Sequence, residues 1–356
     1  MSGRRSRRRT VTAAAGILLG LLGGLLLRPV PHALPDEEYG DPGLAASIRE
    51  LTDDRPSAVA VGVVQGGRIR TASIGAPLAA TYEIGSVSKG ITGMLYVDAV
   101  DRGEVGPHTT LGDVFPLDGV PAADVTLEQL SRHASGLPRL AGGVGTLVRG
   151  TVATVMGTNP YTDSTEDYLG HLRSTGTDGQ VPLYSNYGFA VLGHAVAEQA
   201  GIPYDRLLDG RIARPLELDS LTVPLAEDDL DEHAVAGHDA SGRRQQAWTG
   251  LAAAPAGGIR ADVGDMAELA RSLMAGDAPG SAALDPVADL DGDRIGAGWV
   301  TSEDEGFPYT WHNGGTGGFR SWLGMHRESG TAVVVLASTS TSVDEAGLRL
   351  LKEESR

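Results

Sequence analysis

The chain has 356 residues and a formal net charge of −17, and 41% of its residues are hydrophobic. This length is sufficient for a large domain with its own core, and the composition is that of a globular protein, not a disordered one. The acidic balance excludes a nucleic-acid partner, because phosphate binding requires clustered Lys and Arg. The absence of Cys excludes disulfides, a cysteine nucleophile and a thiolate metal site.

A basic and then apolar N-terminus predicts export from the cytoplasm. Five arginines lie within the first nine residues, and residues 11–27 follow without a charge until Arg28. This order is typical of an export signal, and the Arg7-Arg8 pair is also compatible with a twin-arginine signal. As a helix the apolar run would rise roughly 25 Å, which is marginal for spanning a membrane. We expect residues 1–33 to be an export signal or a membrane anchor, with the rest of the chain outside the cytoplasm, either anchored or secreted after cleavage.

The next segment predicts a linker followed by a single domain. Residues 34–43 continue a proline-rich stretch, so we interpret them as a linker. Residues 44–356 are expected to form the domain. It begins with a β-hairpin over residues 58–73, in which a Gly-Gly pair makes the turn.

Helices are expected to dominate the middle of the domain. The first runs from about Ser86 to Arg102 and ends at a glycine. From about residue 107 to 280 the pattern is mostly helical, with a capping box that starts at Thr126 and an amphipathic helix over residues 186–200. The apolar stretch 140–156 is interpreted as a lid over a cleft or as part of this helical region, and the second interpretation is favoured.

Strand patterns return near the C-terminus and set the predicted fold class. The expected strands are residues 296–301, 309–312, 319–326 and 331–337, followed by a final helix over 342–354. They follow one another too closely for crossover helices, so we expect them to be antiparallel. The predicted fold is α+β: an antiparallel sheet formed from N- and C-terminal strands with flanking helices, plus an inserted, mostly helical lobe. The sheet lobe would comprise about residues 44–85 and 281–356, and the helical lobe about 86–280.

A serine and a lysine at the start of the first helix form the strongest chemical motif. The chain has 27 arginines and two lysines, and one lysine, Lys89, follows Ser86 by three residues. Arg cannot accept a proton, whereas a partly buried Lys can have its pKa lowered enough to do so. This spacing places both side chains on one helix face, and the N–H groups at a helix start stabilise negative charge. We therefore predict Ser86 as a nucleophile and Lys89 as its base, against the alternative of a capping serine and a surface lysine.

Two further segments carry polar groups that suit the same chemistry. Tyr184 and Asn186 stand in a loop before a helix, where the hydroxyl could relay a proton and the amide could bind Lys89 and a substrate carbonyl. The alternative is a packing tyrosine beside a capping asparagine. Residues 311–318 are rich in glycine, which lets a substrate approach the backbone, and the N–H of Gly315 would be a second oxyanion donor. The alternative there is a glycine-rich hairpin turn.

No residue pattern indicates a cofactor or a metal, and we expect neither. The chain has no Gly-x-Ser-x-Gly segment, so a standard α/β-hydrolase is disfavoured. A phosphate-binding loop is also disfavoured, because no Gly-Lys-Ser/Thr follows the glycines.

The order of these motifs resembles that of a known family. Ser-x-x-Lys, Tyr-x-Asn and His-x-Gly are similar to the motifs of the penicillin-recognising serine hydrolases, in particular the class C β-lactamase-like group with its DD-peptidases and carboxylesterases. The resemblance covers about residues 37–340 and includes the segments 132–138, 184–193, 256–260 and 311–319. It implies that Ser86 is acylated, that Lys89 activates it and that Tyr184 is the shared acid and base. It also implies a substrate-binding role for Asn186, His312, Gly314 and Gly315.

One departure from that family pattern bears on the substrate. The chain has His312-Asn313-Gly314 where typical β-lactamases of this group carry Lys-Thr-Gly. A histidine near pH 7 is mostly neutral and attracts a carboxylate less well than a lysine does. We therefore expect a serine hydrolase that acts on esters or on D-amino-acid peptides and amides, so its substrate would be a small ester, an amide or a cell-wall peptide. The protein would be associated with the membrane through its N-terminal segment. The alternatives are a true β-lactamase and a non-catalytic relative that binds cell-wall peptides.

Overall fold

The computed structural model of this chain describes residues 33–356 except 53–55, 143–149, 154 and 178–182. The expected export signal or anchor therefore lies, apart from its last residue, outside the described part, as does half of the apolar stretch 140–156. Among the described residues, no helix is long and apolar enough to cross a membrane.

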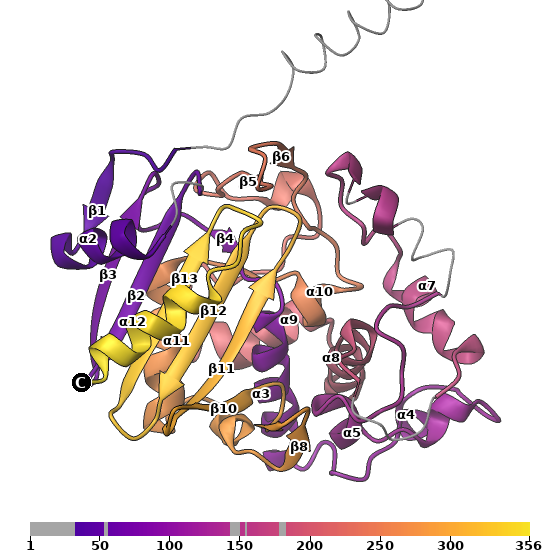
Figure 1. Cartoon of the computed structure of the whole chain (residues 1–356). Coiled ribbons are helices and arrows are strands. Elements are labelled where there is room, and N and C mark those ends of the chain that lie inside the picture. The colour runs from indigo at the N-terminus through magenta and orange to yellow at the C-terminus, as the bar shows by residue number, and fades with distance from the viewer. Residues whose placement is uncertain (1–32, 53–55, 143–149, 154, 178–182) are drawn as a thin grey trace, which may run out of the picture.

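An antiparallel sheet of nine strands runs through the described part of the chain (Figure 1). From one edge to the other its strands are β1 Glu38–Gly40, β3 Arg68–Ile74, β2 Val59–Gln65, β13 Thr331–Ala337, β12 Arg320–His326, β11 Phe307–Gly315, β10 Val300–Asp304, β9 Asp293–Ile295 and β8 Ala288–Leu290. At its centre β2 pairs with β13, so early and late segments of the chain meet side by side. The predicted α+β fold with a sheet built from both ends is confirmed.

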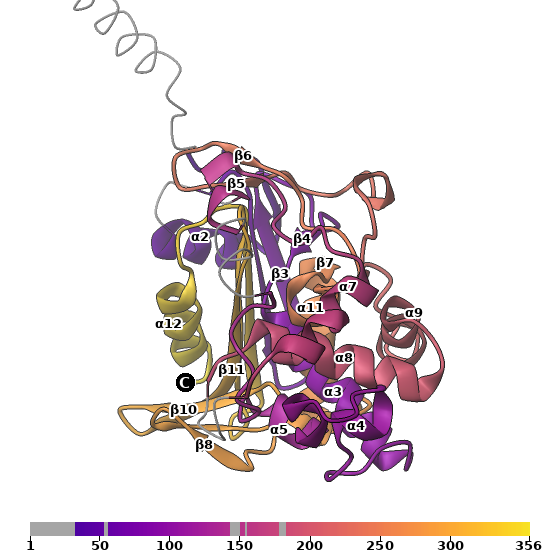
Figure 2. The same cartoon turned by 90° about the vertical axis from the view of Figure 1, so that its right-hand side faces the viewer.

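The two faces of the sheet bury different side chains because strand residues alternate in direction. In β2, Val59, Val61 and Val63 pack into one apolar cluster, and Ala60 and Val64 pack into another. Helices α2 Pro42–Leu51 and α12 Asp344–Glu354 cover the first face. Figure 2 shows this face edge-on, with α2 and α12 on one side of the sheet and α11, α3 and α8 on the other.

The segment expected to be a linker instead contributes structure over residues 38–43. Strand β1 pairs with β3 at the sheet edge. The Asp41 carboxylate then accepts a hydrogen bond of 2.8 Å from the Leu44 N–H and caps α2. Pro42 occupies the first turn of that helix, where the missing N–H has no partner to lose.

On the opposite face lie α3 Val87–Asp101, α8 Asn186–Ala200 and α11 Val263–Ala275. The bounds of α8 agree with the predicted helix. We expected α11 in the helical lobe, but it packs directly on the sheet: a Cβ at Gly62 of β2 would lie 3.0 Å from the Ala267 side chain. The sheet lobe therefore includes α11.

Shorter elements complete the description. They are β4 Tyr82–Glu83, α4 Leu111–Val114, α5 Leu127–Ser131, α7 Thr165–Gly170, α9 Tyr204–Leu208, β5 Gly237–His238, β6 Arg244–Gln245, α10 Ala254–Gly257 and β7 Arg260–Ala261. The predicted capping box starts α5, with reciprocal hydrogen bonds between Thr126 and Gln129. The strand expected at 296–301 is broken by a turn, in which Gly298 has a φ of 77° that strand residues do not adopt.

Candidate active site

Ser86 and Lys89 occupy the first turn of α3 with their side chains in contact. The Lys89 Nζ lies 2.9 Å from the Ser86 Oγ and 2.6 Å from the carbonyl oxygen of Ala256 on α10. Lys89 is fully buried and forms no ion pair with any described residue. Its burial, together with the positive charge of Arg139, lowers its pKa well below the ordinary value. The lysine beside the serine therefore gives up its proton at a lower pH than an ordinary lysine does.

Tyr184 packs over the same pair. Its ring centroid lies 5.0 Å from the Lys89 Nζ and 5.3 Å from the Arg139 Cζ. Burial raises the pKa of Tyr184 to about 12, although a hydrogen bond with Ser86 and the charge of Arg139 oppose this shift. The phenol is consequently protonated near neutral pH and can donate a proton.

A buried histidine holds the Tyr184 loop in place. His133 is 2% exposed, has a positive φ of 58°, and its ring centroid lies 4.5 Å from that of Tyr184. Its Nδ1 accepts a hydrogen bond of 3.1 Å from the Ser185 N–H, and its carbonyl accepts one of 2.8 Å from the Leu183 N–H. The hydrogen bonds on both sides of Tyr184 thus fix the backbone that carries the phenol.

The end of β11 lies directly against the turn that carries the serine. A Cβ on Gly314 would lie 2.1 Å from the Ile84 carbonyl oxygen, and one on Gly85 would lie 2.5 Å from the Gly315 nitrogen. The Ser321 hydroxyl also donates a hydrogen bond of 2.7 Å to the Ile84 carbonyl oxygen. Only glycines permit this approach, and it brings the Gly315 N–H next to Ser86.

His312 does not stand where a substrate contact was expected. It is 4% exposed, and its ring lies beneath Tyr184, with centroids 6.4 Å apart. The Nδ1 donates a hydrogen bond of 2.6 Å to the Asn313 carbonyl oxygen. Burial, assisted by the charge of Lys89, lowers the pKa of His312 to about 3, so this ring is neutral at physiological pH.

A cavity of about 980 Å³ opens in front of Ser86. Among the predicted residues, Ser86, Tyr184, Asn186, Gly314 and Gly315 line it. Lys89 and His312 lie beneath its surface. The structure therefore brings the predicted residues together, five at the wall and two behind it.

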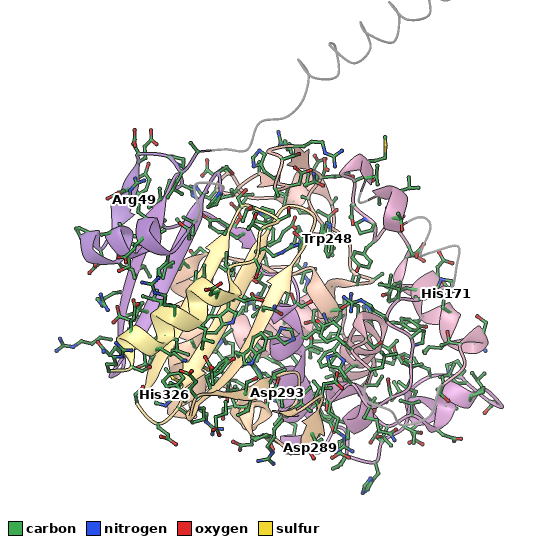
Figure 3. The ribbon with its side chains drawn as sticks, viewed as in Figure 1. Arg49, His171, Trp248, Asp289, Asp293 and His326 are labelled. Carbon is green, nitrogen blue, oxygen red and sulfur yellow. The ribbon has the colours of Figure 1, made fainter. Side chains whose placement is uncertain are left out.

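The cavity wall also contains residues that the sequence did not single out. Tyr161 contacts the edge of Trp248 with ring centroids 4.9 Å apart and hydrogen-bonds with the Asn186 side chain. Trp248 lies beside Gly317 in the loop between β11 and β12 (Figure 3). Arg139 is a further wall residue.

A buried ion pair supports Trp248 from behind. Glu83 and Arg260 are each 2% exposed and approach to 3.3 Å. The Glu83 carboxylate also accepts a hydrogen bond of 2.8 Å from the Trp248 N–H. Burial raises the pKa of Glu83, and the guanidinium of Arg260 opposes that shift. The sequence places Glu83 three residues before Ser86, and this proximity is the signal that could have marked it.

Comparisons with known proteins agree with this arrangement. Residues 44–354 match the model of the Beta-lactamase family. The chain belongs to the β-lactamase family. As a member of this family, with the carboxypeptidase relatives described next, it is a serine hydrolase. Within the described residues, no group of three or more His, Cys, Asp or Glu side chains could hold a metal ion.

Several relatives of this β-lactamase-family chain cover most of its length. D-alanyl-D-alanine-carboxypeptidase/endopeptidase AmpH of Escherichia coli (strain K12) is 27% identical over 293 residues, which cover 74% of this chain and 73% of AmpH. Penicillin-binding protein 4 of Amycolatopsis lactamdurans is 27% identical over 332 residues, covering 85% and 82%. The class C β-lactamase from Rhodobacter sphaeroides has the same fold, with a TM-score of 0.73 at 20% identity, covering 88% and 98%.

Proposed function

We propose that this chain is an extracytoplasmic serine hydrolase that forms an acyl-enzyme on Ser86. The observation that carries the proposal is the 2.9 Å contact between the Ser86 Oγ and a buried Lys89 that has no carboxylate partner among the described residues. A neutral amine in that position accepts the hydroxyl proton as the Oγ attacks a carbonyl carbon. A non-catalytic binding protein would have no use for a buried lysine beside a serine.

The negative charge that develops on the attacked carbonyl requires donors. The N–H of Ser86 stands at the N-terminus of α3, where amides lack partners within the helix. The N–H of Gly315 approaches from the end of β11. Together these two groups would bind the oxyanion of the tetrahedral intermediate.

Tyr184 would complete the proton transfers. Its phenol is protonated near neutral pH and can donate to the leaving oxygen or nitrogen as the bond to the carbonyl carbon breaks. The protonated Lys89 then returns its proton to the phenolate, which restores both groups. In the second half of the reaction, water replaces the leaving group and the same transfers run in reverse.

The proposed substrates are esters or D-amino-acid peptides and amides. The names of AmpH and of penicillin-binding protein 4 support a cell-wall peptide or a related amide. The neutral state of His312, whose pKa is about 3, supports the expectation that this position does not attract a carboxylate as a lysine would. True β-lactamase activity stays the alternative.

Labelling with a fluorophosphonate and mass spectrometry of the peptides tests the nucleophile. We expect labelling of Ser86 and its loss in Ser86→Ala, together with loss of 4-nitrophenyl acetate hydrolysis. Ser88→Ala is the matched control, because Ser88 lies two residues away but is fully buried, with its Oγ 3.3 Å from the Ile259 N–H. Labelling that persists in Ser86→Ala would disprove the proposal. Parallel assays with a D-Ala-D-Ala peptide and a penicillin identify the substrate class.

The extracytoplasmic location rests on residues 1–33 of the sequence. A fusion of residues 1–40 to alkaline phosphatase, which is active only outside the cytoplasm, should produce activity. The control fusion of residues 34–40 alone should produce none. Equal activity from both would contradict the export proposal, and the partition between membrane and soluble fractions separates an anchor from a cleaved signal.

A further inference from the structure

The last two carbonyl oxygens of the short helix α10 that could accept a hydrogen bond have no partner in its backbone. In a longer helix, the oxygens of Pro255 and Ala256 would accept from the amides four residues further on. Those amides donate elsewhere: the Ile259 N–H to the Ser88 Oγ at 3.3 Å, and the Arg260 N–H to a carbonyl oxygen of another segment at 2.9 Å. Both oxygens are therefore open to side chains from outside α10.

Two side chains of α3 bind these oxygens. The Lys89 Nζ lies 2.6 Å from the Ala256 oxygen, and the Thr92 hydroxyl donates a hydrogen bond of 2.7 Å to the Pro255 oxygen. The two residues are three apart, so they share one face of the helix. Both are fully buried. The bond from Thr92 thus joins α10 to α3 one turn away from the bond that binds the lysine amine.

The Thr92 hydroxyl is itself bound by Tyr204 at the start of α9. The two hydroxyl oxygens lie 2.7 Å apart. A hydroxyl has one hydrogen to donate, and Thr92 donates its own to the Pro255 oxygen, so Tyr204 is the donor to Thr92. Burial raises the pKa of Tyr204, which keeps the phenol protonated for this role. A chain of hydrogen bonds therefore runs from Tyr204 through Thr92 to α10.

The position of α10 determines how the Lys89 amine faces Ser86. A neutral amine has two hydrogens and one lone pair. When one hydrogen points at the Ala256 oxygen, the lone pair is free to face the Ser86 Oγ, which lies 2.9 Å from the Nζ. A displacement of α10 would turn the amine or remove its acceptor. A misplacement of about 1 Å in such an arrangement can cost roughly a hundredfold in rate.

We propose that Thr92, bound by Tyr204, is a positioning residue for the reaction at Ser86, because it keeps the Ala256 carbonyl where that group orients the Lys89 amine. The proposal rests on the proposed function of Ser86 and Lys89 and adds residues that no substrate touches. Thr92 and Tyr204 are fully buried and do not line the cavity in front of Ser86. Their loss should therefore slow the chemical step and leave substrate binding intact.

The test is Thr92→Val, which removes the hydroxyl and keeps a side chain of similar shape. The rate constant of acylation, from the burst with 4-nitrophenyl acetate, should fall roughly tenfold or more, whereas the dissociation constant of the ester should change little. The acid limb of kcat/KM should move to lower pH by roughly half to one unit, because the ammonium form of Lys89 loses a carbonyl acceptor. Thr92→Ser restores the hydroxyl and should recover most of both values. Tyr204→Phe should give smaller changes in the same directions.

The limb is a specific readout because the ionisable groups around Lys89 stay in place in these variants. They are His133, Arg139, Tyr184 and His312, from the loops on either side of the cavity and from β11. No charge is added or removed by Thr92→Val. A shift of the limb therefore reports the surroundings of the amine and not a general loss of stability.

Thr331→Val is the matched control. It also removes the hydroxyl of a buried threonine, one that accepts a hydrogen bond of 2.9 Å from the Ser329 hydroxyl. Thr331 stands opposite Gln65 at the end of β2, beside an exposed turn. We expect its acylation rate constant and its acid limb to equal those of the wild type, whatever the change in stability.

Thr92→Val with an unchanged acylation rate constant, or with a limb that stays in place or moves to higher pH, would show that the threonine serves only the fold, and it would overturn the proposal. Should Thr92→Val fail to fold, unchanged values in Tyr204→Phe would overturn it in the same way. Turnover by Ser86→Ala would instead refute the proposed function itself.

Discussion

Lys89 and Ser86 are hydrogen-bonded at 2.9 Å, and Lys89 has no acidic partner among the described residues. In the proposed mechanism the lysine accepts a proton, so Lys89→Arg should abolish ester hydrolysis although it retains a cation, with kcat falling by about three orders of magnitude or more. The measurement is burst and steady-state kinetics with 4-nitrophenyl acetate. Wild-type rates in this variant would show that the lysine is a structural cation.

The pH dependence of kcat/KM should report the Lys89 pKa. As the proposed base, Lys89 is active when neutral, so activity should fall as the pH drops through its lowered pKa. The charge of Arg139 contributes to that lowering, and Arg139→Gln should therefore move the acid limb to higher pH. The profile is measured with a neutral ester. A limb that stays in place in Arg139→Gln would contradict this account.

Acid should destabilise the fold partly through His312. Burial lowers its folded-state pKa to about 3, whereas in the unfolded chain it titrates near the ordinary value of 6.5. Between those pH values the unfolded state binds more protons, so the free energy of unfolding falls as the pH falls, by up to about 1.4 kcal/mol per pH unit. In urea titrations at pH 4, 5 and 6, His312→Gln should reduce this slope. His108→Gln, a change at an exposed position, should leave it unchanged.

The buried Glu83–Arg260 pair should matter for stability more than any exposed pair. Glu83→Gln leaves the Arg260 guanidinium buried without its counter-charge, which should lower the free energy of unfolding by about 3–5 kcal/mol. Arg349→Gln breaks the exposed pairs with Glu50 and Glu353 and should lower the free energy of unfolding far less than Glu83→Gln does. Equal effects in denaturant titrations would contradict the prediction. The fluorescence of Trp248 should also change in Glu83→Gln, since the Glu83 carboxylate accepts a hydrogen bond from the backbone N–H of Trp248.

Gly85→Ala should inactivate the enzyme by displacing β11. The added methyl would lie 2.5 Å from the Gly315 nitrogen, and Gly85 has a φ of 50° that alanine disfavours. We expect hydrolysis to fall at least about a hundredfold, which is the usual effect of losing one oxyanion donor. Gly103→Ala is the control, because Gly103 also has a positive φ but no atom lies near its Cβ position. Similar activities of the two variants would argue against Gly315 as an oxyanion donor.

The sequence predicted those contacts of the site that join residues close together in the chain. Ser86 and Lys89 are one helical turn apart, so their contact follows from helix geometry alone. The strand over residues 331–337 and the helix over 186–200 were also predicted within their observed bounds, because each has a clear apolar pattern and helix α8 ends at Gly201. Residues 34–43 were wrongly predicted as a linker, because their prolines are typical of one. The Asp41-Pro42 pair within that stretch is a helix-start signal, and it marks the observed start of α2.

Contacts between distant segments could not be predicted in this way. Strand alternation places His312 and Asn313 on opposite sides of β11, but it does not say which side faces the cavity. Arg139, Tyr161 and Trp248 reach the cavity from three loops, and their positions depend on how the helices pack. No spacing in the sequence links these residues to Ser86.

The pairing of β2 with β13 has a consequence for biosynthesis. The residues of β2 emerge early, yet their second neighbour exists only after the chain has been made to about residue 337. Until then the alternating valines of β2 have an open edge, which favours aggregation, and pairing over such a separation is slow because the long intervening loop must close first. The turn that carries Ser86 packs against β11, which is also synthesised late. An incomplete chain should therefore be inactive, and activity should appear only when the final strands dock.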